Sequence, residues 1–398
     1  MKMSSIPDIQ PRARSHKPCI AVIGHLADAH LYGAERSLLS VVAAIDRDRY
    51  DLCAVVPGYN EQYMQAIGRY TDAIEVFPYS WWNRARRFDA ATVSRFADLF
   101  RSRSIDLVHV NTITLMDPLL AARQVGIPCI VHARELIDQD DDLARLLGEE
   151  PAAIVARIRA GADFIIANSD ATHRLYHVEG RSFRLYNCID IDVFDMANEV
   201  VPGSLKVGII SGNHPKKGIE AFVRLAVLAA SRRPTLEFVV IGPHTAHTED
   251  LALRLRRETA PVNLHFAGYV ADPVDAVRQV NVVVSFSAVA ESFGRTLAEA
   301  MAARRPVIAY DRGAVPELVR HGIEGFVIPP LDIEQALVHI ETLADNPELV
   351  AAMGAAGRAR AKNLFAPAVF ASHLNDIYTR IFEMSSRSTG LPTWPAGC

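Results

Sequence analysis

The strongest constraint in this sequence is a regular alternation of short apolar runs with longer helical segments. "CIAVIGHL" at 19–26 is a β-branched run with the length of a buried strand, and "GAERSLLSVVAAI" at 33–45 follows with apolar residues at helical spacing. "YDLCAVVP" at 50–57 begins the next repeat. Strands separated by helices in this way predict a parallel sheet that is covered by helices on both faces.

The same pattern continues through the first half of the chain and then restarts in the second half. The remaining strands are predicted at 106–111, 128–133, 163–169, 205–211, 237–242, 263–268, 281–287 and 305–310. A chain of 398 residues exceeds the size at which one hydrophobic core keeps growing. We therefore predict an α/β protein with two doubly wound domains, and we place their boundary in the polar segment 195–204.

The bulk composition argues against several classes of protein. A formal net charge of -4 gives no overall attraction to nucleic acid or to anionic lipid. The five cysteines are scattered without a C-x-x-C pair, which argues against a zinc site and against a disulfide framework. The apolar runs are far shorter than the roughly 20 residues that span a bilayer, and residues 1–17 contain no apolar stretch typical of a signal peptide. We expect a cytoplasmic protein.

Polar and glycine-rich residues collect where the predicted strands end. They are Gly24, His25, Asn111, His132 and Ser169 in the first half, and Gly242 with the stretches 211–218, 266–270 and 286–294 in the second. In open α/β sheets, ligands bind outside the carboxyl ends of the strands, next to helix N-termini. One such edge on each of two sheets predicts a ligand-binding cleft between two domains that face each other.

The stretch "ESFGRTLAE" at 291–299 places two glutamates eight residues apart. On one helix this spacing would separate them by about 12 Å, whereas the carboxylate pairs of glycoside hydrolysis lie roughly 5–9.5 Å apart. A better interpretation places Glu291 in the loop after a strand and begins the helix near Phe293 and Gly294. The helix N-terminus would bind phosphate, and a carboxylate on either side would hold hydroxyls, as in a sugar nucleotide. Taken singly, either glutamate is more simply a helix cap or a solvated side chain.

This E-x7-E stretch, with its internal Phe-Gly and the following "EAMAARRPVIAYDRGAVPELV", resembles the signature of the retaining GT-B glycosyltransferases of family four. Other matching pieces are "GAERSLL" at 33–39, "NCIDIDVF" at 187–194, the Lys-Gly pair at 217–218 and "GIEGFVIPP" at 322–330. The resemblance covers roughly residues 19–382. It implies the GT-B fold, in which two Rossmann-like domains face each other across a cleft.

With this fold in view, we divide the chain into four parts. They are an acceptor-side domain at 18–198, a nucleotide-sugar domain at 199–365, a helix at 366–382 that crosses back to the first domain, and a tail at 383–398. The resemblance implies transfer of a hexose, with retained anomeric configuration, from a UDP- or GDP-linked donor to a hydroxyl acceptor. That acceptor would be a glycan or a lipid-linked saccharide in polysaccharide biosynthesis.

The mechanism proposed for the family lets a phosphate oxygen of the donor take the proton of the acceptor. It therefore needs no dedicated carboxylate base, and we expect no essential metal and no cofactor. The acidic run "DQDDD" at 138–142 is interpreted as a solvated surface segment.

The resemblance also assigns roles to single residues. Glu291 would hold hydroxyls of the donor sugar, Glu299 would hold the ribose hydroxyls, and His132 would face the reacting sugar. The rest of the donor site would consist of Gly33, Gly268, Ser287, Phe293, Gly294, Arg295 and Thr296. Lys217, a compact cation after a glycine-containing loop, would stabilise the negative charge of the leaving diphosphate.

Two positions depart from the family pattern. Asn213 stands where the family usually has an arginine, so this donor contact would lack its charge unless Arg295 compensates. Tyr32 replaces the first glycine of the N-terminal loop and would narrow the approach to the phosphates. A donor-binding subunit with little activity therefore stays open as an alternative, as does a sugar-nucleotide epimerase of the same architecture.

The acceptor side is less defined by the sequence. Asn111 and Arg134 are candidate acceptor-binding residues. The stretch "YSWWNRARRFD" at 79–89 combines two tryptophans with three arginines and would suit a lipid-borne acceptor at the inner face of the membrane. A loop with two partly buried tryptophans is the simpler interpretation. The identity of the base, the sugar and the acceptor, and the oligomeric state, are left open by the sequence.

Overall fold

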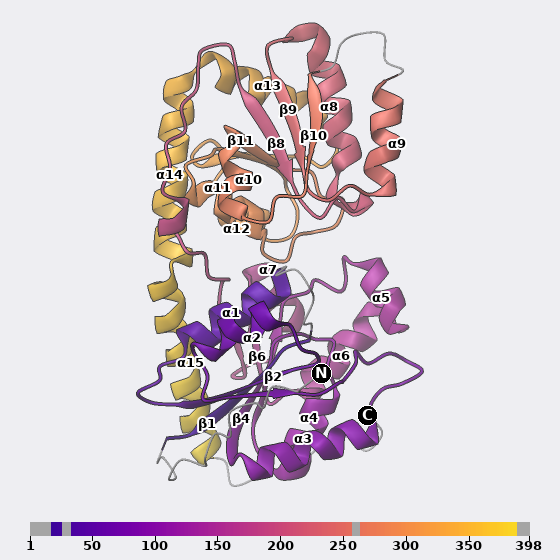
Figure 1. The fold of residues 1–398 in the computed structure, drawn as a ribbon, viewed down its shortest axis with the longest axis vertical. Coiled ribbons are helices and arrows are strands. Elements are labelled where there is room, and N and C mark those ends of the chain that lie inside the picture. The colour runs from indigo at the N-terminus through magenta and orange to yellow at the C-terminus, as the bar shows by residue number, and fades with distance from the viewer. Residues whose placement is uncertain (1–16, 26–32, 257–262, 388–398) are drawn as a thin grey trace, which may run out of the picture.

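A computed structural model describes residues 17–25, 33–256 and 263–387 of the chain. These residues form two α/β units stacked end to end, each built around a parallel sheet with helices on both faces (Figure 1). The predicted α/β class with two doubly wound sheets is therefore confirmed. Tyr32, and residues 388–398 of the predicted tail, lie outside the described residues.

The first unit contains a seven-stranded parallel sheet in the order β3-β2-β1-β4-β5-β6-β7. Its strands are β1 (Cys19–Ile23), β2 (Asp51–Val56), β3 (Ala73–Val76), β4 (Ile105–Val110), β5 (Cys129–Ala133), β6 (Phe164–Ala167) and β7 (Ser182–Arg184). Its helices are α1 (Gly33–Ala44), α2 (Glu61–Gly68), α3 (Ala90–Ser102), α4 (Asp117–Val125), α5 (Asp141–Leu147), α6 (Pro151–Gly161) and α7 (Asp170–Tyr176). The short helix η1 (Asp192–Phe194) follows β7 on the way to the second unit.

The second unit contains a six-stranded parallel sheet in the order β10-β9-β8-β11-β12-β13. Its strands are β8 (Lys206–Ile210), β9 (Glu237–Ile241), β10 (Leu264–Gly268), β11 (Val282–Ser285), β12 (Val307–Tyr310) and β13 (Gly325–Ile328). Its helices are η2 (Pro215–Lys217), α8 (Ile219–Arg232), α9 (Ala246–Leu255), α10 (Pro273–Arg278), α11 (Arg295–Ala302), α12 (Val315–Leu318), α13 (Ile333–Asp345) and α14 (Pro347–Phe365).

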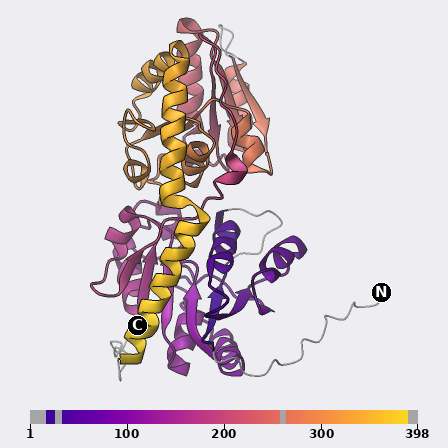
Figure 2. The same cartoon turned by 90° about the vertical axis from the view of Figure 1, so that its left-hand side faces the viewer.

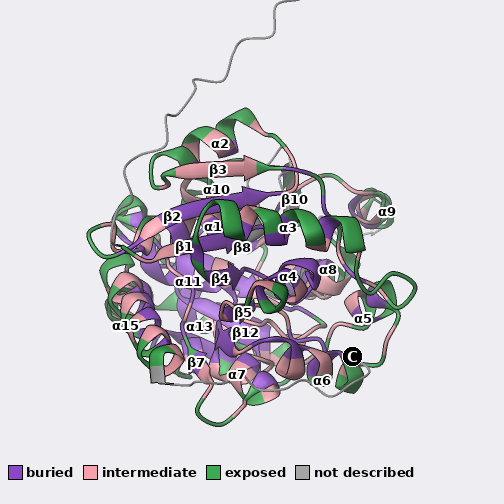
Figure 3. Ribbon diagram, turned by 90° about the horizontal axis from the view of Figure 1, so that it is seen from below, coloured by how far each residue is buried: buried purple, intermediate pink, exposed green. Residues whose placement is uncertain are grey.

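Both faces of the first sheet are buried, which explains why its strands read as continuous apolar runs. In β1, Ile20 and Val22 belong to the core under α1, whereas Ala21 and Ile23 belong to the core under α3 and α4. Seen from below, the central strands are buried, the edge strand β3 is only partly buried, and the outer faces of the surrounding helices are exposed (Figure 3). The two cores fix the sheet between two helical layers.

The last helix, α15 (Pro367–Arg387), returns from the second unit to the first. It follows α14 directly, and the two helices run along both units (Figure 2). Its apolar residues Phe370, Leu374, Tyr378 and Ile381 are buried in the same core as Val41 of α1. The final helix of the chain thus completes the core of the first unit.

All of the predicted strands are present, and most of them are shorter than predicted. Three further strands, β3, β7 and β13, were not predicted. Each has three or four residues and lies at an edge of its sheet. β3 and β7 bury few of their side chains and so carry little apolar periodicity, whereas β13 is buried at three of its four positions and is only short.

In both sheets the strand order reverses at one point. The reversal lies between β1 and β4 in the first sheet, and between β8 and β11 in the second. Because helices leave in opposite directions from such a point, a crevice opens there at the carboxyl ends of the strands. These two places are where the fold itself predicts a ligand site.

Gly218 provides a test of how closely the loop after β8 approaches β11. Gly126 and Gly218 have the same φ of 79°, but a Cβ at Gly126 would meet nothing within 4 Å, whereas at Gly218 it would lie 2.0 Å from the Phe286 carbonyl oxygen. Gly126→Ala should cost about 1–2 kcal/mol for the left-handed backbone alone. We expect Gly218→Ala to lower the melting temperature at least twice as far, measured by calorimetry. Equal losses would mean that this close approach does not exist.

Candidate active site

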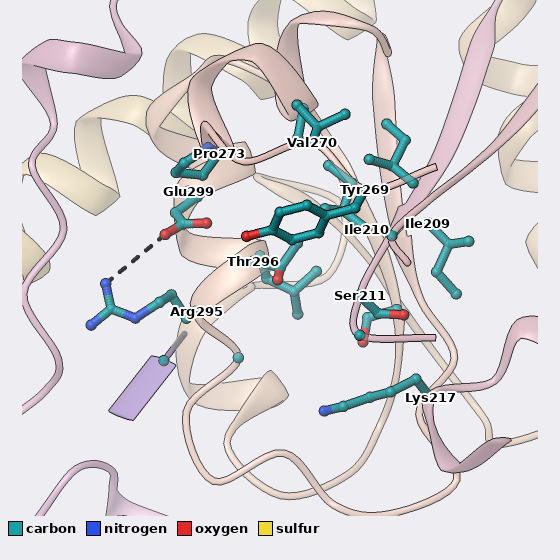
Figure 4. A pocket seen from close by; sticks show the side chains of 18 of the residues that line it. Ile209, Ile210, Ser211, Lys217, Tyr269, Val270, Pro273, Arg295, Thr296 and Glu299 are labelled. Atoms are coloured by element: carbon teal, nitrogen blue, oxygen red, sulfur yellow. Dashed lines mark ion pairs between the residues drawn. The ribbon is translucent and has the colours of Figure 1, made fainter. Parts of the chain in front are cut away.

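A cavity of about 340 Å³ lies between the two units, where the reversal points of the sheets face each other. The first unit contributes Gly33 and Arg36 from the start of α1. The second unit contributes the ends of β8, β9 and β11, the segment that follows β10, and the first turn of α11. Glu299 and Arg295 lie at one side of this pocket, and Lys217 lies at the other (Figure 4).

Helix α11 points its N-terminus at this cavity. Gly294 precedes it with φ 84°, a left-handed conformation that favours glycine, and no described side chain caps the helix. Gly294, Arg295 and Thr296 all line the cavity. Free backbone N–H groups at a helix N-terminus attract an anion, so this end of the cavity suits a phosphate group.

Glu299 lies one turn further along α11 and is only 4% exposed. Its Oε1 accepts a hydrogen bond from Arg36 Nη2 at 2.5 Å, and Arg295 Nη1 lies 3.9 Å from the same oxygen. Arg36 belongs to the first unit, so this ion pair bridges the cleft. Two guanidinium groups therefore lie beside one buried carboxylate at the edge of the phosphate-binding end.

Lys217 and Glu291 form a second ion pair at the opposite side of the cavity. Lys217 Nζ lies 2.7 Å from Glu291 Oε1, and both side chains are partly exposed to the cleft. Lys217 ends η2, and Gly218 then turns the chain into α8. The pair holds the lysine ammonium and the carboxylate in defined positions at this side of the cavity.

Asn213 does not face this cavity, so its predicted role in donor binding is not supported by its position. Its side chain is 2% exposed, and Nδ2 donates a hydrogen bond to the carbonyl oxygen of Pro243 at 3.0 Å. Its Oδ1 accepts a hydrogen bond from Ser211 Oγ at 3.0 Å. The amide therefore ties the loop after β8 to the loop after β9. Asparagine also suits the backbone at this position, because it adopts the left-handed conformation of φ 55° more readily than most residues.

A second, smaller cavity of about 160 Å³ adjoins the Lys217–Glu291 pair. Its polar lining includes Arg134 and Glu135 from the first unit, and Lys217, Ser287 and Glu291 from the second. Ser287 borders this cavity rather than the one at α11. Its Oγ donates to the carbonyl oxygen of Val289.

Arg134 is held in place by three neutral acceptors. Its Nε donates to Asn111 Oδ1 at 2.9 Å, its Nη1 donates to Asn187 Oδ1, and its Nη2 lies 3.1 Å from His132 Nδ1. Asn111 and His132 are fully buried behind it. Asn111 therefore positions Arg134 and is not among the residues that line the cavity, and its role as an acceptor ligand stays a prediction.

His132 is neutral in this environment. Burial is the main cause that lowers the pKa of its imidazole well below the ordinary value, followed by the charge of Arg134. A neutral imidazole donates one hydrogen bond and accepts another. His132 lies behind Arg134 and is not among the residues that line either cavity, so its contact with the reacting sugar stays a prediction.

Further contacts join the two units, one of them beside the smaller cavity. Lys216 Nζ lies 2.9 Å from Asp140 Oδ2 across the cleft, so the predicted solvated run at 138–142 includes one residue that binds the other unit. Glu317 of α12 accepts hydrogen bonds from the backbone N–H groups of Asp170 and Ala171 at the start of α7. These contacts hold the cleft in the observed arrangement.

The aromatic-basic stretch at 79–89 divides into a buried and an exposed part. Trp82 is 3% exposed, and its Nε1 donates to the carbonyl oxygen of Ile113 at 3.0 Å. Arg86 and Arg87 are exposed and pair with Asp89 and Glu149. Within the described ranges, no helix combines the length and the apolar character needed to cross a membrane.

The structure brings most of the predicted donor residues to one cleft. Those that line the larger cavity are Gly33, Lys217, Glu291, Gly294, Arg295, Thr296 and Glu299. Gly268 ends β10 and accepts a hydrogen bond from the Gly242 N–H, while the Phe293 side chain lies in the core of the second unit. Tyr269 and Val270, next to Gly268, line the cavity instead.

Two site residues were not identified from the sequence. Arg36 lies one turn into α1, three residues after Gly33, so both residues are on the side of the helix that lines the cavity. Glu135 follows Arg134 at the end of β5 and accepts a hydrogen bond from Thr112 Oγ1 at 2.8 Å. Among the residues described, no group of three or more histidine, cysteine, aspartate or glutamate side chains could hold a metal ion.

Comparison with known protein families gives two adjoining matches. Residues 197–360 match the model for group 1 glycosyl transferases, and residues 32–184 match the model for a glycosyl transferase 4-like domain. A D-inositol 3-phosphate glycosyltransferase of Streptomyces griseus is 26% identical over 350 residues, which cover 82% of this chain and 71% of that protein. The human alpha-1,3/1,6-mannosyltransferase ALG2 is 24% identical over 310 residues, or 69% of this chain and 73% of that protein.

Solved structures share the fold. Anabaena HepE in complex with UDP-glucose superimposes with a TM-score of 0.74 at 19% identity, over 91% of this chain and 99% of that one. A glycosyltransferase of Rickettsia africae superimposes with a TM-score of 0.74 at 16% identity, over 93% of this chain and 100% of that one. The architecture is the GT-B fold.

The assignment of Asn213 to structure rather than to ligand can be tested with two variants. Asn213→Ala and Asn213→Gly both remove the bonds to Pro243 and Ser211, a loss of about 1–3 kcal/mol for buried partners. Only alanine adds strain at φ 55°, so Asn213→Ala should melt at the lower temperature of the two, and both below the wild type. A side chain that served only the ligand would leave the melting temperature of the free protein unchanged in both variants.

Proposed function

This chain belongs to the group 1 glycosyltransferases of GT-B fold, and we propose that it transfers a hexose from a UDP- or GDP-linked donor to a saccharide hydroxyl with retained anomeric configuration. Sugar transfer from a nucleotide sugar in glycan biosynthesis is the activity of the family. The sugar configuration, the base and the roles of single residues are our proposal. The acceptor in this proposal is a glycan or a lipid-linked saccharide.

One observation carries the proposal for the donor site. The uncapped N-terminus of α11, the cation Lys217 and the two carboxylates Glu291 and Glu299 all border one cavity. Its volume of about 340 Å³ lies within the range of small-molecule sites. A helix N-terminus with a cation suits a diphosphate, and carboxylates at either side suit the hydroxyl groups of a ribose and a hexose.

We propose that the donor lies across the start of α11. Its diphosphate would accept hydrogen bonds from the backbone N–H groups of Arg295 and Thr296, and its ribose hydroxyls would bind Glu299. The base would extend toward Tyr269 and Val270, which line the same cavity. The hexose would reach the smaller cavity beside Glu291, which neighbours Arg134 of the first unit. HepE, which has this fold, binds UDP-glucose, and UDP-sugars are therefore the first donors to test.

Lys217 would supply the main electrostatic stabilisation of the leaving group. When the bond between the anomeric carbon and the phosphate oxygen breaks, negative charge develops on the nucleoside diphosphate. Lys217 lies where that charge would appear, and the N-terminus of α11 adds its dipole. Arg36 and Arg295 add positive potential at the ribose side. They would supply part of the positive charge that the family usually has from an arginine at the position of Asn213.

The charged groups beside the smaller cavity support a reaction without a carboxylate base. Glu291 is paired with Lys217, Asp140 with Lys216, and Glu135 accepts from Thr112. We propose that the acceptor hydroxyl attacks the anomeric carbon from the side that the diphosphate leaves. The departing phosphate oxygen then takes the hydroxyl proton, so the new glycosidic bond retains the configuration and no metal is needed.

We also propose that the reaction takes place in the cytoplasm. The four described cysteines are free, which fits a reducing compartment. The acceptor would reach the cleft from the first unit, whose surface carries the exposed arginines at 84–87.

Donor binding without metal is the first test of this function. We expect one UDP- or GDP-sugar to raise the melting temperature in the presence of EDTA. At 100 times its dissociation constant, the ligand adds about 2.7 kcal/mol to the free energy of unfolding. The product formed with a hydroxyl acceptor should keep the anomeric configuration of the donor, as read from its proton NMR coupling. An inverted product would exclude the mechanism, and an isomeric donor formed without acceptor would identify an epimerase.

Two neighbouring lysines provide a matched test of the leaving-group site. We expect Lys217→Ala to lower kcat by about 100- to 1,000-fold, because a cation at the developing charge is lost. Lys216→Ala removes the same charge one residue earlier, where the side chain binds Asp140, and should lower kcat less than tenfold. Steady-state kinetics with the donor at saturation would measure both. Similar losses in the two variants would mean that Lys217 has no special position.

A further inference from the structure

Four side chains in the first unit form a continuous hydrogen-bonded chain from α15 to the smaller cavity. The Tyr378 hydroxyl lies 2.7 Å from His109 Nδ1, and His109 Nε2 lies 3.2 Å from His132 Nδ1. Arg134 Nη2 lies 3.1 Å from the same His132 Nδ1 and lines the cavity. Tyr378, His109 and His132 are each 0% exposed.

The fold explains why these groups meet. His109 and His132 lie on the neighbouring parallel strands β4 and β5, with His109 paired to Ile130. Residues two apart on a strand share a face, so Ile130 and His132 point to the same side as His109. Helix α15 covers that side and brings Tyr378 over His109 from 269 residues further along the chain. Local sequence offers no sign of this contact.

The chemistry of the donors fixes the proton positions. Arg134 only donates, so Nδ1 of His132 must accept and carries no proton. The neutral ring therefore has its proton on Nε2. Because Nδ1 of His132 is an acceptor, His109 must donate to it from Nε2, which leaves His109 Nδ1 free to accept the Tyr378 hydroxyl proton. Both rings are then neutral, and the His109 and Arg134 donors share the one lone pair of His132 Nδ1.

Both imidazoles are suited to remain neutral. Burial is the main cause that lowers the pKa of His109 to about 3, and Arg134 contributes second. Burial and Arg134 likewise lower the pKa of His132. The groups that face the two rings are Arg134, Tyr378 and each other, and no carboxylate is hydrogen-bonded to either ring in the described part of the chain.

Among the four side chains Tyr378, His109, His132 and Arg134, one buried polar atom is left without a partner. His132 Nε2 is buried and makes no hydrogen bond in the structure. A buried donor without an acceptor costs about 1–3 kcal/mol, and a network that served stability alone would gain by satisfying it. The arrangement instead leaves one N–H group without a partner, on the imidazole whose other nitrogen contacts the arginine that lines the cavity.

We propose that Tyr378 and His109 are positioning residues, which fix the proton of His132 on Nε2 so that this N–H can donate to an oxygen of the bound hexose. The inference rests on the proposed function for the identity of that ligand. Arg134 supports the same tautomer from the cavity side. Because Tyr378 and His109 are fully buried, they keep the tautomer independent of any contact that Arg134 makes with a substrate.

Nitrogen-15 NMR of the imidazole rings tests the proton positions in the unmodified protein. The chain has 14 histidines, and the spectra of His109→Gln and His132→Gln identify the two signals. We expect both rings to be neutral near pH 7 with the proton on Nε2, and the His132 signal to shift when the sugar nucleotide that stabilises the protein is added. A proton on His132 Nδ1, or a charged ring, would overturn the proposal.

Tyr378→Phe tests the contribution of α15 and keeps the ring packing. We expect the His109 signal to move toward a mixture of tautomers and kcat to fall about tenfold, since one hydrogen bond of ordinary strength is lost. The KM for the donor should change less than threefold. Tyr50→Phe is the matched control, because its ring packs on Tyr378 and its hydroxyl bonds neither histidine. It should leave both signals and kcat unchanged.

The outcomes separate this inference from the proposed function. Donor binding and transfer with unchanged tautomers and unchanged kcat in Tyr378→Phe would retain the function and reject the role of Tyr378. A failure of every nucleotide sugar to stabilise the protein would reject the function and the substrate contact of His132 together. If Tyr378→Phe does not fold, the spectrum of the unmodified protein still decides the tautomer.

Discussion

The site depends on one constraint, which is that all the strands in each sheet run in the same direction. Parallel strands bring all their carboxyl ends to one edge of the sheet, and the helix after each strand carries the chain back to the opposite edge. Two such sheets, stacked with those edges toward each other, place residues from distant parts of the chain in one cleft. The first turn of α11, the lysine that ends η2 and the polar ends of β4 and β5 lie there for the same topological reason.

Much of this could be predicted because it depends on local patterns. Apolar periodicity gives the strands and helices, and the alternation gives the parallel sheets. The E-x7-E stretch predicts that Glu291 and Glu299 flank a helix start, as observed. Asn213 could not be placed, because a short amide is equally suited to a ligand or to the backbone of an adjacent loop. Arg36 and Tyr378 act through partners more than 250 residues away in the sequence, which local patterns cannot reveal.

The cleft holds its charges in pairs. Arg36 binds Glu299, Lys217 binds Glu291, and Lys216 binds Asp140. A buried or half-buried charge without a partner is costly, so each member of a pair offsets the cost of burying the other. A ligand that binds Glu299 or Lys217 must take the place of an existing partner. Its affinity therefore reflects the difference between two sets of contacts, and the released Arg36 becomes available to the ligand.

The return of α15 to the first unit affects how the chain can fold during synthesis. The sheet of the first unit is complete once β7 has left the ribosome, but the apolar face between α1 and β1 still lacks Phe370, Leu374 and Ile381. At 5–20 residues per second, roughly ten seconds or more pass before α15 emerges. The unit that is translated first is thus the last to be finished. Its uncovered face has to stay soluble in the meantime, either within the nascent chain or with the help of a chaperone.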